Sequence, residues 1–240
     1  MKYSLALAVG LLAAGSVLAD TNNAASVSNA VAKLAAAPNY SWTVTLQLPN
    51  APFTPSPVNG STEKGGYSIV SQEFNGDTMQ AVFKGNKIAV KGEDDWQSIS
   101  DADDQTAMMA GWLVNAGTPA AEATRLLKDA ADLTNDDNGM IGGNLTPAGA
   151  TEMLTPPARG GNTPPPPKNA KGSVRFWLNP DGTLAKFESH LGGQMSFGPD
   201  QQEQDFEVIR TVAVHDVGTT KVAIPDGAMK ALGSKTDPAS

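Results

Sequence analysis

The stretch that decides the fold is residues 40–48, which read YSWTVTLQL. Apolar side chains alternate there with serine, threonine and glutamine, and this period of two places successive side chains on opposite faces of a β-strand. One face of the strand is therefore apolar, and the other carries hydroxyl and amide groups. Such a strand is typical of an antiparallel sheet that packs one face on a core.

An amphipathic helix is predicted immediately before this strand. Val27, Ala30, Val31 and Leu34 recur at i, i+3, i+4 and i+7, the spacing that gathers side chains on one face of an α-helix. Pro38 ends the pattern because proline cannot continue a helix. The chain is thus expected to pass directly from a helix into the strand.

A meander of short antiparallel strands is predicted after a loop. Residues 49–61 contain four prolines and are predicted to form the loop. Asn-Gly at 75–76 and Gly-Asn at 85–86 are hairpin turn signals, and connections this short force neighbouring strands to pair antiparallel. The expected strands within residues 62–100 are 67–74, 78–84, 87–91 and 96–99.

The middle of the chain is predicted to be helical, and the last third returns to strands. Asp103 or Asp104, Thr118 and Thr146 are helix-start signals, and proline follows each threonine. The expected helices are residues 104–113, 118–131, 147–155 and 228–232. The expected strands are a small strand or hairpin at 136–145, followed by 171–178, 183–191, 194–197 and 206–215.

This order of elements predicts an α+β fold. We expect a curled antiparallel sheet, or unclosed β-barrel, with helices covering or plugging its concave face. Residues 20–232 are assigned to a single domain, because too few elements follow the proline-rich residues 155–168 to form a second core. Residues 155–168 are predicted to be a flexible or extended surface loop, and residues 233–240 a flexible tail.

The first 19 residues have the pattern of a signal peptide. A basic Lys2 precedes a short apolar run, and Val17, Leu18 and Ala19 form a small-residue cleavage pattern before Asp20. The apolar run is too short for a membrane anchor, and no other segment is long and apolar enough to span a bilayer. We therefore predict a soluble periplasmic or secreted protein.

The composition excludes several classes of function. The chain has no cysteine, two histidines and a net charge of −8, which argues against a disulfide framework, a thiolate metal site and nucleic-acid binding. Nucleophile, Walker, dinucleotide and zinc-protease motifs are missing from the sequence. We predict a protein that is not an enzyme, with no cofactor and no metal, and the sequence names no protein partner.

Two carboxylate hypotheses remain open. If folding brings two carboxylates together, they would support the hypothesis of a hydrolase such as a glycosidase. The acidic residues 93–104 either bind calcium or form a solvated loop whose last acids favour a helix N-terminus. Residues 135–139, NDDNG, faintly resemble a calcium-binding loop but lack two of its ligands, so they are predicted to form a turn.

The candidate ligand-binding residues lie on the apolar faces of the alternating strands. If the sheet curls, these faces form a concave surface that the helices either cover as a lid or fill as a dry core. Arg210 interrupts an apolar set, so it needs solvent at a sheet edge, an acidic partner or a ligand headgroup. The candidates are Trp42, Val44, Leu46, Phe83, Phe176, Phe206, Val208 and Arg210.

The C-terminal sequence 214–225, VHDVGTTKVAIP, adds a family resemblance. Together with the N-terminal helix, the meander and the central helices, it resembles the periplasmic lipoprotein-carrier superfamily of LolA, LolB and the mycobacterial LppX-type lipid-binding lipoproteins. This resemblance implies an unclosed antiparallel barrel that holds acyl chains beneath a helical lid, and the missing lipidation cysteine fits a soluble carrier. No ligand residues are carried over from it.

The function predicted from the sequence is an exported soluble carrier of an apolar ligand, either a lipid or an acyl chain. The alternative is a non-catalytic exported scaffold or interaction protein whose core is filled by its own side chains.

Overall fold

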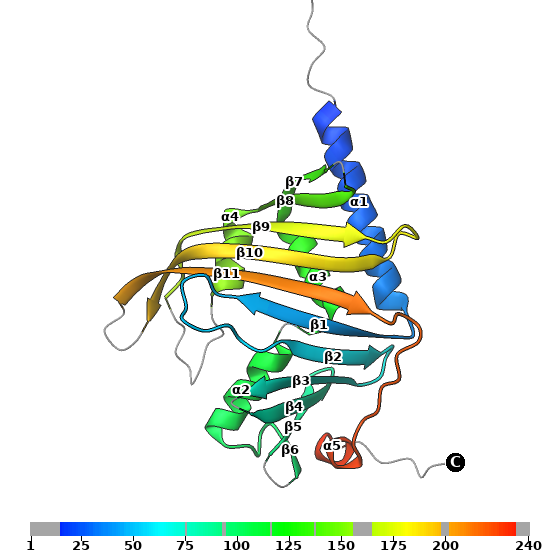
Figure 1. Ribbon diagram of the computed structural model, residues 1–240, viewed down its shortest axis with the longest axis vertical. Coiled ribbons are helices and arrows are strands. Elements are labelled where there is room, and N and C mark those ends of the chain that lie inside the picture. Colours follow the sequence, from blue (N-terminus) through cyan, green and yellow to red (C-terminus); the bar gives the residue numbers. More distant parts are fainter. Residues whose placement is uncertain are drawn as a thin grey trace, which may run out of the picture.

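A single large sheet dominates the computed structural model, which describes residues 15–74, 76–92, 95–115, 117–136, 138–155, 165–197 and 202–233. In this part of the chain, eleven strands pair antiparallel in the order β6-β5-β4-β3-β2-β1-β11-β10-β9-β8-β7 (Figure 1). The edge strands β6 and β7 do not pair with each other, so the sheet curls without closing. The predicted α+β class with an unclosed, curled sheet is confirmed.

The secondary structure follows the chain in blocks. The strands are β1 (Asn39–Gln47), β2 (Val58–Glu63), β3 (Ser68–Phe74), β4 (Asp77–Lys84), β5 (Lys87–Lys91), β6 (Trp96–Ser98), β7 (Ala130–Asn135), β8 (Met140–Leu145), β9 (Lys168–Leu178), β10 (Leu184–Phe197) and β11 (Gln202–His215). The helices are α1 (Gly15–Ala36), α2 (Asp104–Val114), α3 (Pro119–Asp129), α4 (Pro147–Leu154) and α5 (Asp226–Ala231).

The first and last strands meet in the middle of the sheet. β1 pairs antiparallel with β11, with Trp42 opposite Val214 and Val44 opposite Val212. Both strands therefore turn the same apolar set to one face. The alternation predicted for residues 40–48 is confirmed in β1, where Tyr40, Trp42 and Val44 are buried and the residues between them are not.

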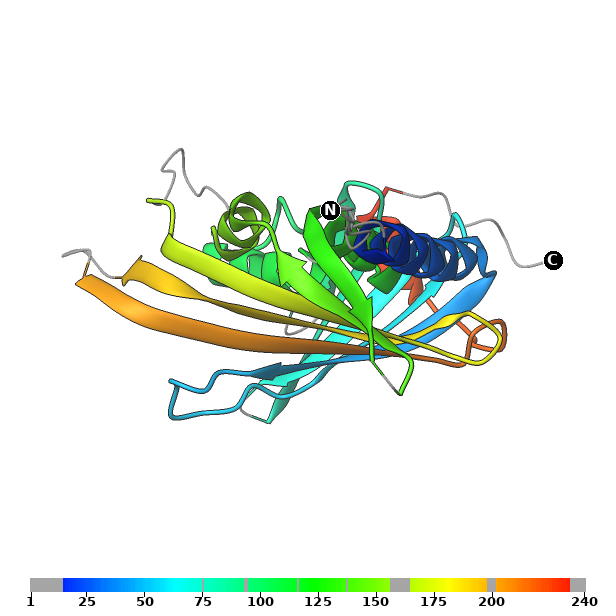
Figure 2. The ribbon, with the colours of Figure 1, turned by 90° about the horizontal axis from the view of Figure 1, so that it is seen from above.

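Four helices cover the concave face of the sheet. Both α1 and α4 contact β9 and β10, α2 contacts β3 to β5, and α3 packs between α1 and α4. Seen from above, α1 and α4 lie on the same side of the sheet, and the ends of β10 and β11 project beyond them (Figure 2). The helix predicted from residues 27–34 is confirmed, and all four residues of its apolar face are buried.

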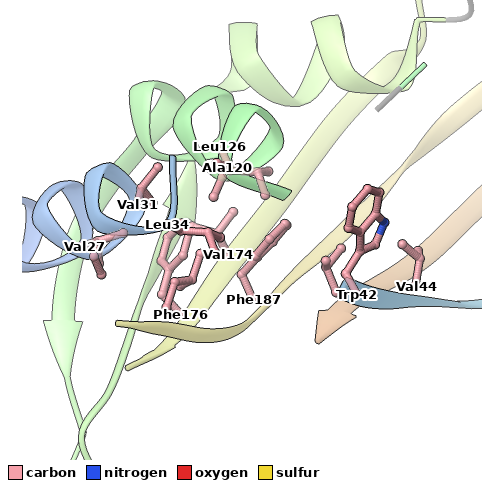
Figure 3. Packing of buried hydrophobic residues seen from close by; sticks show 14 of the residues in the cluster. Val27, Val31, Leu34, Trp42, Val44, Ala120, Leu126, Val174, Phe176 and Phe187 are labelled. Atoms are coloured by element: carbon pink, nitrogen blue, oxygen red, sulfur yellow. The ribbon is translucent and has the colours of Figure 1, made fainter. Parts of the chain in front are cut away.

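The main core lies between these helices and the sheet. Leu34 of α1 and Leu126 of α3 pack toward Phe176 and Phe187 on β9 and β10 (Figure 3). The rings of Phe176 and Phe187 have centroids 6.4 Å apart and are tilted by 35°. This half of the concave face is therefore filled by the protein's own side chains.

A smaller core lies on the opposite face of β4 and β5. Val82 and Ala89 alternate with the main-core residues of these strands and pack with Ala228 and Leu232 from the α5 region. The sheet is thus covered on both faces at its β3–β6 end. This second cover was not anticipated from the short apolar pattern of α5.

Away from this second core, the convex face carries polar pairs that join neighbouring strands. Arg175 of β9 and Glu188 of β10 form an ion pair at 3.1 Å, and the Lys186 ammonium lies 3.7 Å from the centroid of the Trp177 ring. These residues alternate with buried ones on the same strands, which is the pattern of a sheet with one solvated face.

Two sequence-based strand assignments are wrong. Residues 58–61, predicted to be part of a loop, belong to β2, which pairs with β1 and β3. The strands predicted at 183–191 and 194–197 are one continuous strand, β10. Gly192 and Gly193, which suggest a strand end in the sequence, lie at a shift in the pairing register between β10 and β9. In both cases glycine lies inside a strand instead of ending it.

The central predictions hold with small changes of boundary. The Asp103 carboxylate caps α2 by accepting from the amides of Gln105 and Thr106, and Thr146 caps α4. The helix predicted at 118–131 ends at Asp129, because residues 130–135 pair with β8 as the first strand of a hairpin. Of the predicted proline-rich loop, residues 156–164 lie outside the described part of the chain, as do residues 1–14 of the predicted signal peptide.

The C-terminal motif around Asp216 is a turn at the end of β11. Asp216 has a φ of 49°, and its carbonyl accepts from the backbone amides and the hydroxyls of Thr219 and Thr220. Gly218 has a φ of 82° and donates its amide to the carbonyl of Asn39. The Gly-Thr-Thr step therefore ties the last strand to the first, which is a structural role.

Candidate functional site on the concave face

The structure divides the eight predicted site residues into two groups. Trp42, Val44 and Phe176 are at most 3% exposed and belong to the main core. Trp42 lies directly over Gly60 of β2, where a Cβ atom would come within 2.2 Å of the indole ring. These three side chains are fixed by packing within the protein itself.

The other apolar candidates are half-buried at the margin of the core. They are Leu46, Phe83, Phe206 and Val208. Phe83, Phe206 and Val208 pack against the main core without being enclosed by it. They are joined there by Met153, Ala170 and Met195, from α4, β9 and β10. An apolar strip thus follows β9, β10 and β11 from the closed core toward their projecting ends.

The strand registers place Arg210 at the start of this strip. Arg210 of β11 lies opposite Leu46 of β1 on one side and Ser189 of β10 on the other. Val208 and Val212 precede and follow it on the same face, because side chains alternate along a strand. The charge therefore lies between apolar neighbours, as the sequence predicted.

The acidic partner of Arg210 is Glu122 on α3. The Arg210 Nε atom donates to Glu122 Oε1 at 2.6 Å, and Nη2 donates to Oε2 at 3.0 Å, a two-point pairing in which the side chains are only 24% and 10% exposed. The sequence required solvent, an acidic partner or a ligand headgroup for Arg210, and the structure provides the acidic partner. This ion pair links α3, which lies between α1 and α4, to β11 in the middle of the sheet.

A pocket of about 310 Å³ lies elsewhere, beside the start of β1. Its lining residues are Ala35, Ala37, Tyr40, Thr62, Glu63, Lys64, Gly65, Thr118, Ala120, Ala121 and Thr124. This volume is at the lower end of the range for small-molecule sites, about 300–1,000 Å³. None of the eight predicted site residues lines it, and its small and polar side chains have no periodicity that marks a pocket in the sequence.

The Tyr40 phenol at this pocket has a shifted pKa. Burial raises the pKa of Tyr40 above its ordinary value, and hydrogen bonds from the Thr118 hydroxyl and the Ala120 amide oppose the shift without cancelling it. A raised pKa in the folded state stabilises the fold below the ordinary tyrosine pKa of about 10, and this contribution is lost as the pH rises through the folded value.

We therefore expect the stability advantage of the wild type over Tyr40→Phe to shrink between about pH 8 and about pH 11, because only the wild type must ionise a buried phenol. Urea denaturation of both proteins at the two pH values measures it. An advantage that is constant or grows with pH would contradict the assignment.

The candidate groups for acid–base or metal chemistry are dispersed. His190 pairs with Glu207 at 2.5 Å on the convex face, and Asp216 accepts a hydrogen bond from Ser41. At the loop that resembles a calcium site, the Asp136 carboxylate accepts from the amides of Asn138 and Met140, and the Asp136 carbonyl accepts from the Gly139 amide, as predicted for a turn. No group of three metal-binding side chains occurs among the residues that the structure describes.

The helices of the described residues include none with the length and hydropathy that a membrane span requires.

No family model matches the sequence, and no curated protein matches it. Solved structures similar to the chain include the Mycobacterium tuberculosis lipoprotein LppX, with 14% identity and a TM-score of 0.49 over 86% of this chain and 100% of that one. LprF from Mycobacterium bovis has 11% identity and a TM-score of 0.44 over 87% of this chain and 98% of that one. A LolA superfamily protein from Nitrosomonas europaea has 11% identity and a TM-score of 0.34 over 82% of this chain and 94% of that one. The resemblance seen in the sequence names this same group of proteins, and at these identities the likeness concerns the fold.

Proposed function

We propose that this protein is an exported carrier that shelters a lipid or an acyl chain against the concave face of its sheet. The observation that carries the proposal is the half-buried apolar strip of Phe206, Val208, Met195 and Ala170, which continues from the closed core along the projecting strands. Covering these side chains with hydrocarbon would contribute about 0.8 kcal/mol for each buried CH₂ group.

The proposed ligand position is the strip and not the closed core. Trp42, Val44 and Phe176 then act as the wall that ends the site, while Leu46, Phe206, Val208 and Arg210 contact the ligand. Phe83 lies on β4, near α2, and would line the site on the other side of β1.

Val208→Asp is expected to weaken binding of a fluorescent fatty-acyl probe at least about tenfold, because a carboxylate in the strip must lose its water when the chain binds. Ile209→Asp is the matched control, since Ile209 is also half-buried but faces the convex side. Fluorescence titration gives both affinities, and far-UV circular dichroism checks that both variants fold. Equal losses in the two variants would contradict a site on the concave face.

The alternative of a non-catalytic scaffold has its own supporting observation. Phe176 and Phe187 are 0% exposed beneath α1 and α3, so the helices complete a dry core over that half of the sheet. Native mass spectrometry of gently extracted protein separates the two functions. Absence of bound lipid, together with failure of acyl probes to bind at micromolar concentrations, would leave the scaffold as the function.

The proposed export predicts that the signal peptide is removed at one defined position. We expect cleavage after Ala19, because the apolar run ends there in a small-residue pattern. The intact mass of protein recovered from the cell envelope or medium should correspond to residues 20–240. A mass that corresponds to residues 1–240 would contradict export by this signal.

A further inference from the structure

The concave face holds hydrogen-bonding groups that no described residue uses. A guanidinium has five N–H groups, and Glu122 receives two of those of Arg210. Among the described residues, no acceptor receives the other three. The Arg210 side chain is 24% exposed and none of its nitrogens is both buried and without a partner, so these N–H groups reach water and are available to a ligand.

Ser189 adds a second unused group at the same place. It is only 4% exposed, and no described residue donates to its hydroxyl or accepts from it. Ser189 lies directly opposite Arg210 in the pairing of β10 with β11, which places their Cβ atoms about 4.5–5.5 Å apart. Neither the Ser189 hydroxyl oxygen nor a guanidinium nitrogen of Arg210 is both buried from solvent and without a hydrogen-bond partner.

The charge balance decides what kind of group fits there. The positive charge of Arg210 is already neutralised by Glu122, which is almost fully buried. A carboxylate or phosphate would add a second negative charge beside Glu122, and burying an unpaired charge is expensive. An uncharged carbonyl accepts the same hydrogen bonds without that cost.

We propose that Arg210 and Ser189 bind the uncharged carbonyl of an esterified acyl ligand, with its hydrocarbon lying along the apolar strip. This inference rests on the proposed carrier function and names its ligand class. Val208 and Phe206 come before Arg210 on the same face of β11, and four residues of strand span about 14 Å. A chain anchored at Arg210 therefore runs toward the projecting end of the sheet.

Three pyrene-labelled chains of equal length test the proposal, one ending in a methyl ester, one in a carboxylate and one in a methyl group. At about pH 8, the full-length mature wild type should bind the ester about tenfold more tightly than either of the others, which corresponds to about 1.4 kcal/mol. Ser189→Ala and the double variant Glu122→Leu with Arg210→Met should bind the ester no better than the methyl-terminated chain. Ser173→Ala, which removes a hydroxyl from the convex face of β9, should keep the preference.

Glu122→Gln gives the sharpest contrast, because it leaves the charge of Arg210 uncompensated. The preference should then pass from the ester to the carboxylate by about tenfold. If this variant does not fold, Ser189→Ala and the double variant decide the question. Equal binding of all three probes to the wild type overturns this inference and leaves the carrier function standing. An ester preference that survives in Ser189→Ala and in the double variant has the same meaning. If the wild type binds none of the probes, the inference and the carrier function are both overturned.

Discussion

Replacing Phe187 with alanine is expected to lower the free energy of unfolding by about 3–5 kcal/mol, the cost of removing a large side chain from a closed core. Phe187 is 0% exposed and lies against Phe176 on the neighbouring strand. The surrounding structure relaxes only partly into the space, so a cavity remains. Urea denaturation measures the change.

Phe74→Ala is the control for this prediction. Phe74 ends β3 with half of its surface exposed, so its removal should change stability by no more than about 0.5 kcal/mol. A similar loss in both variants would mean that the core does not lie beneath α1 and α3.

Replacing Glu122 with alanine is expected to cost about 3 kcal/mol, because Arg210 is left with a charge that has no partner. The value is at the low end for a buried ion pair, since the Arg210 side chain is still a quarter exposed and water screens it. Removing both charges, with Glu122→Leu and Arg210→Met together, should restore most of the stability.

The more exposed pair of Arg175 and Glu188 provides the comparison. Its arginine is 54% exposed, so Glu188→Ala should cost less than about 1 kcal/mol. If Glu122→Ala is no more costly than Glu188→Ala, the link between α3 and the sheet is not made by this ion pair.

The fold was largely predictable from the sequence because alternation and capping are local signals. Residues 40–48 show their buried face directly, and Asp103 and Thr146 mark helix starts that the structure confirms. β2 was partly missed because its concave positions are Val58, Gly60 and Thr62, and only one of them is apolar. Gly60 is required there by the indole of Trp42 on the next strand, a contact that no local pattern contains.

The site was less predictable because it depends on pairs that are distant in the chain. The sequence showed that Arg210 needed a partner, but Glu122 is 88 residues away on a helix and nothing local connects them. Phe187 and Ser189 did have a signal, since they alternate with Lys186, Glu188 and His190 on a predicted strand. Identifying them required knowing which face of that strand meets Arg210, and only the pairing of β10 with β11 supplies this.

The pairing of the first strand with the last has a consequence for how the chain folds. Ser41 and Asp216 contact each other across 175 residues, and β1 and β11 form the middle of the sheet instead of an edge. Contacts of such long separation are slow to form, because the entropy of closing the loop is lost before the pairing stabilises it. The two halves of the sheet can form early as hairpins, but they cannot join until β11 is available. A chain delivered from its N-terminus would therefore stay open at its centre until almost all of it had been released.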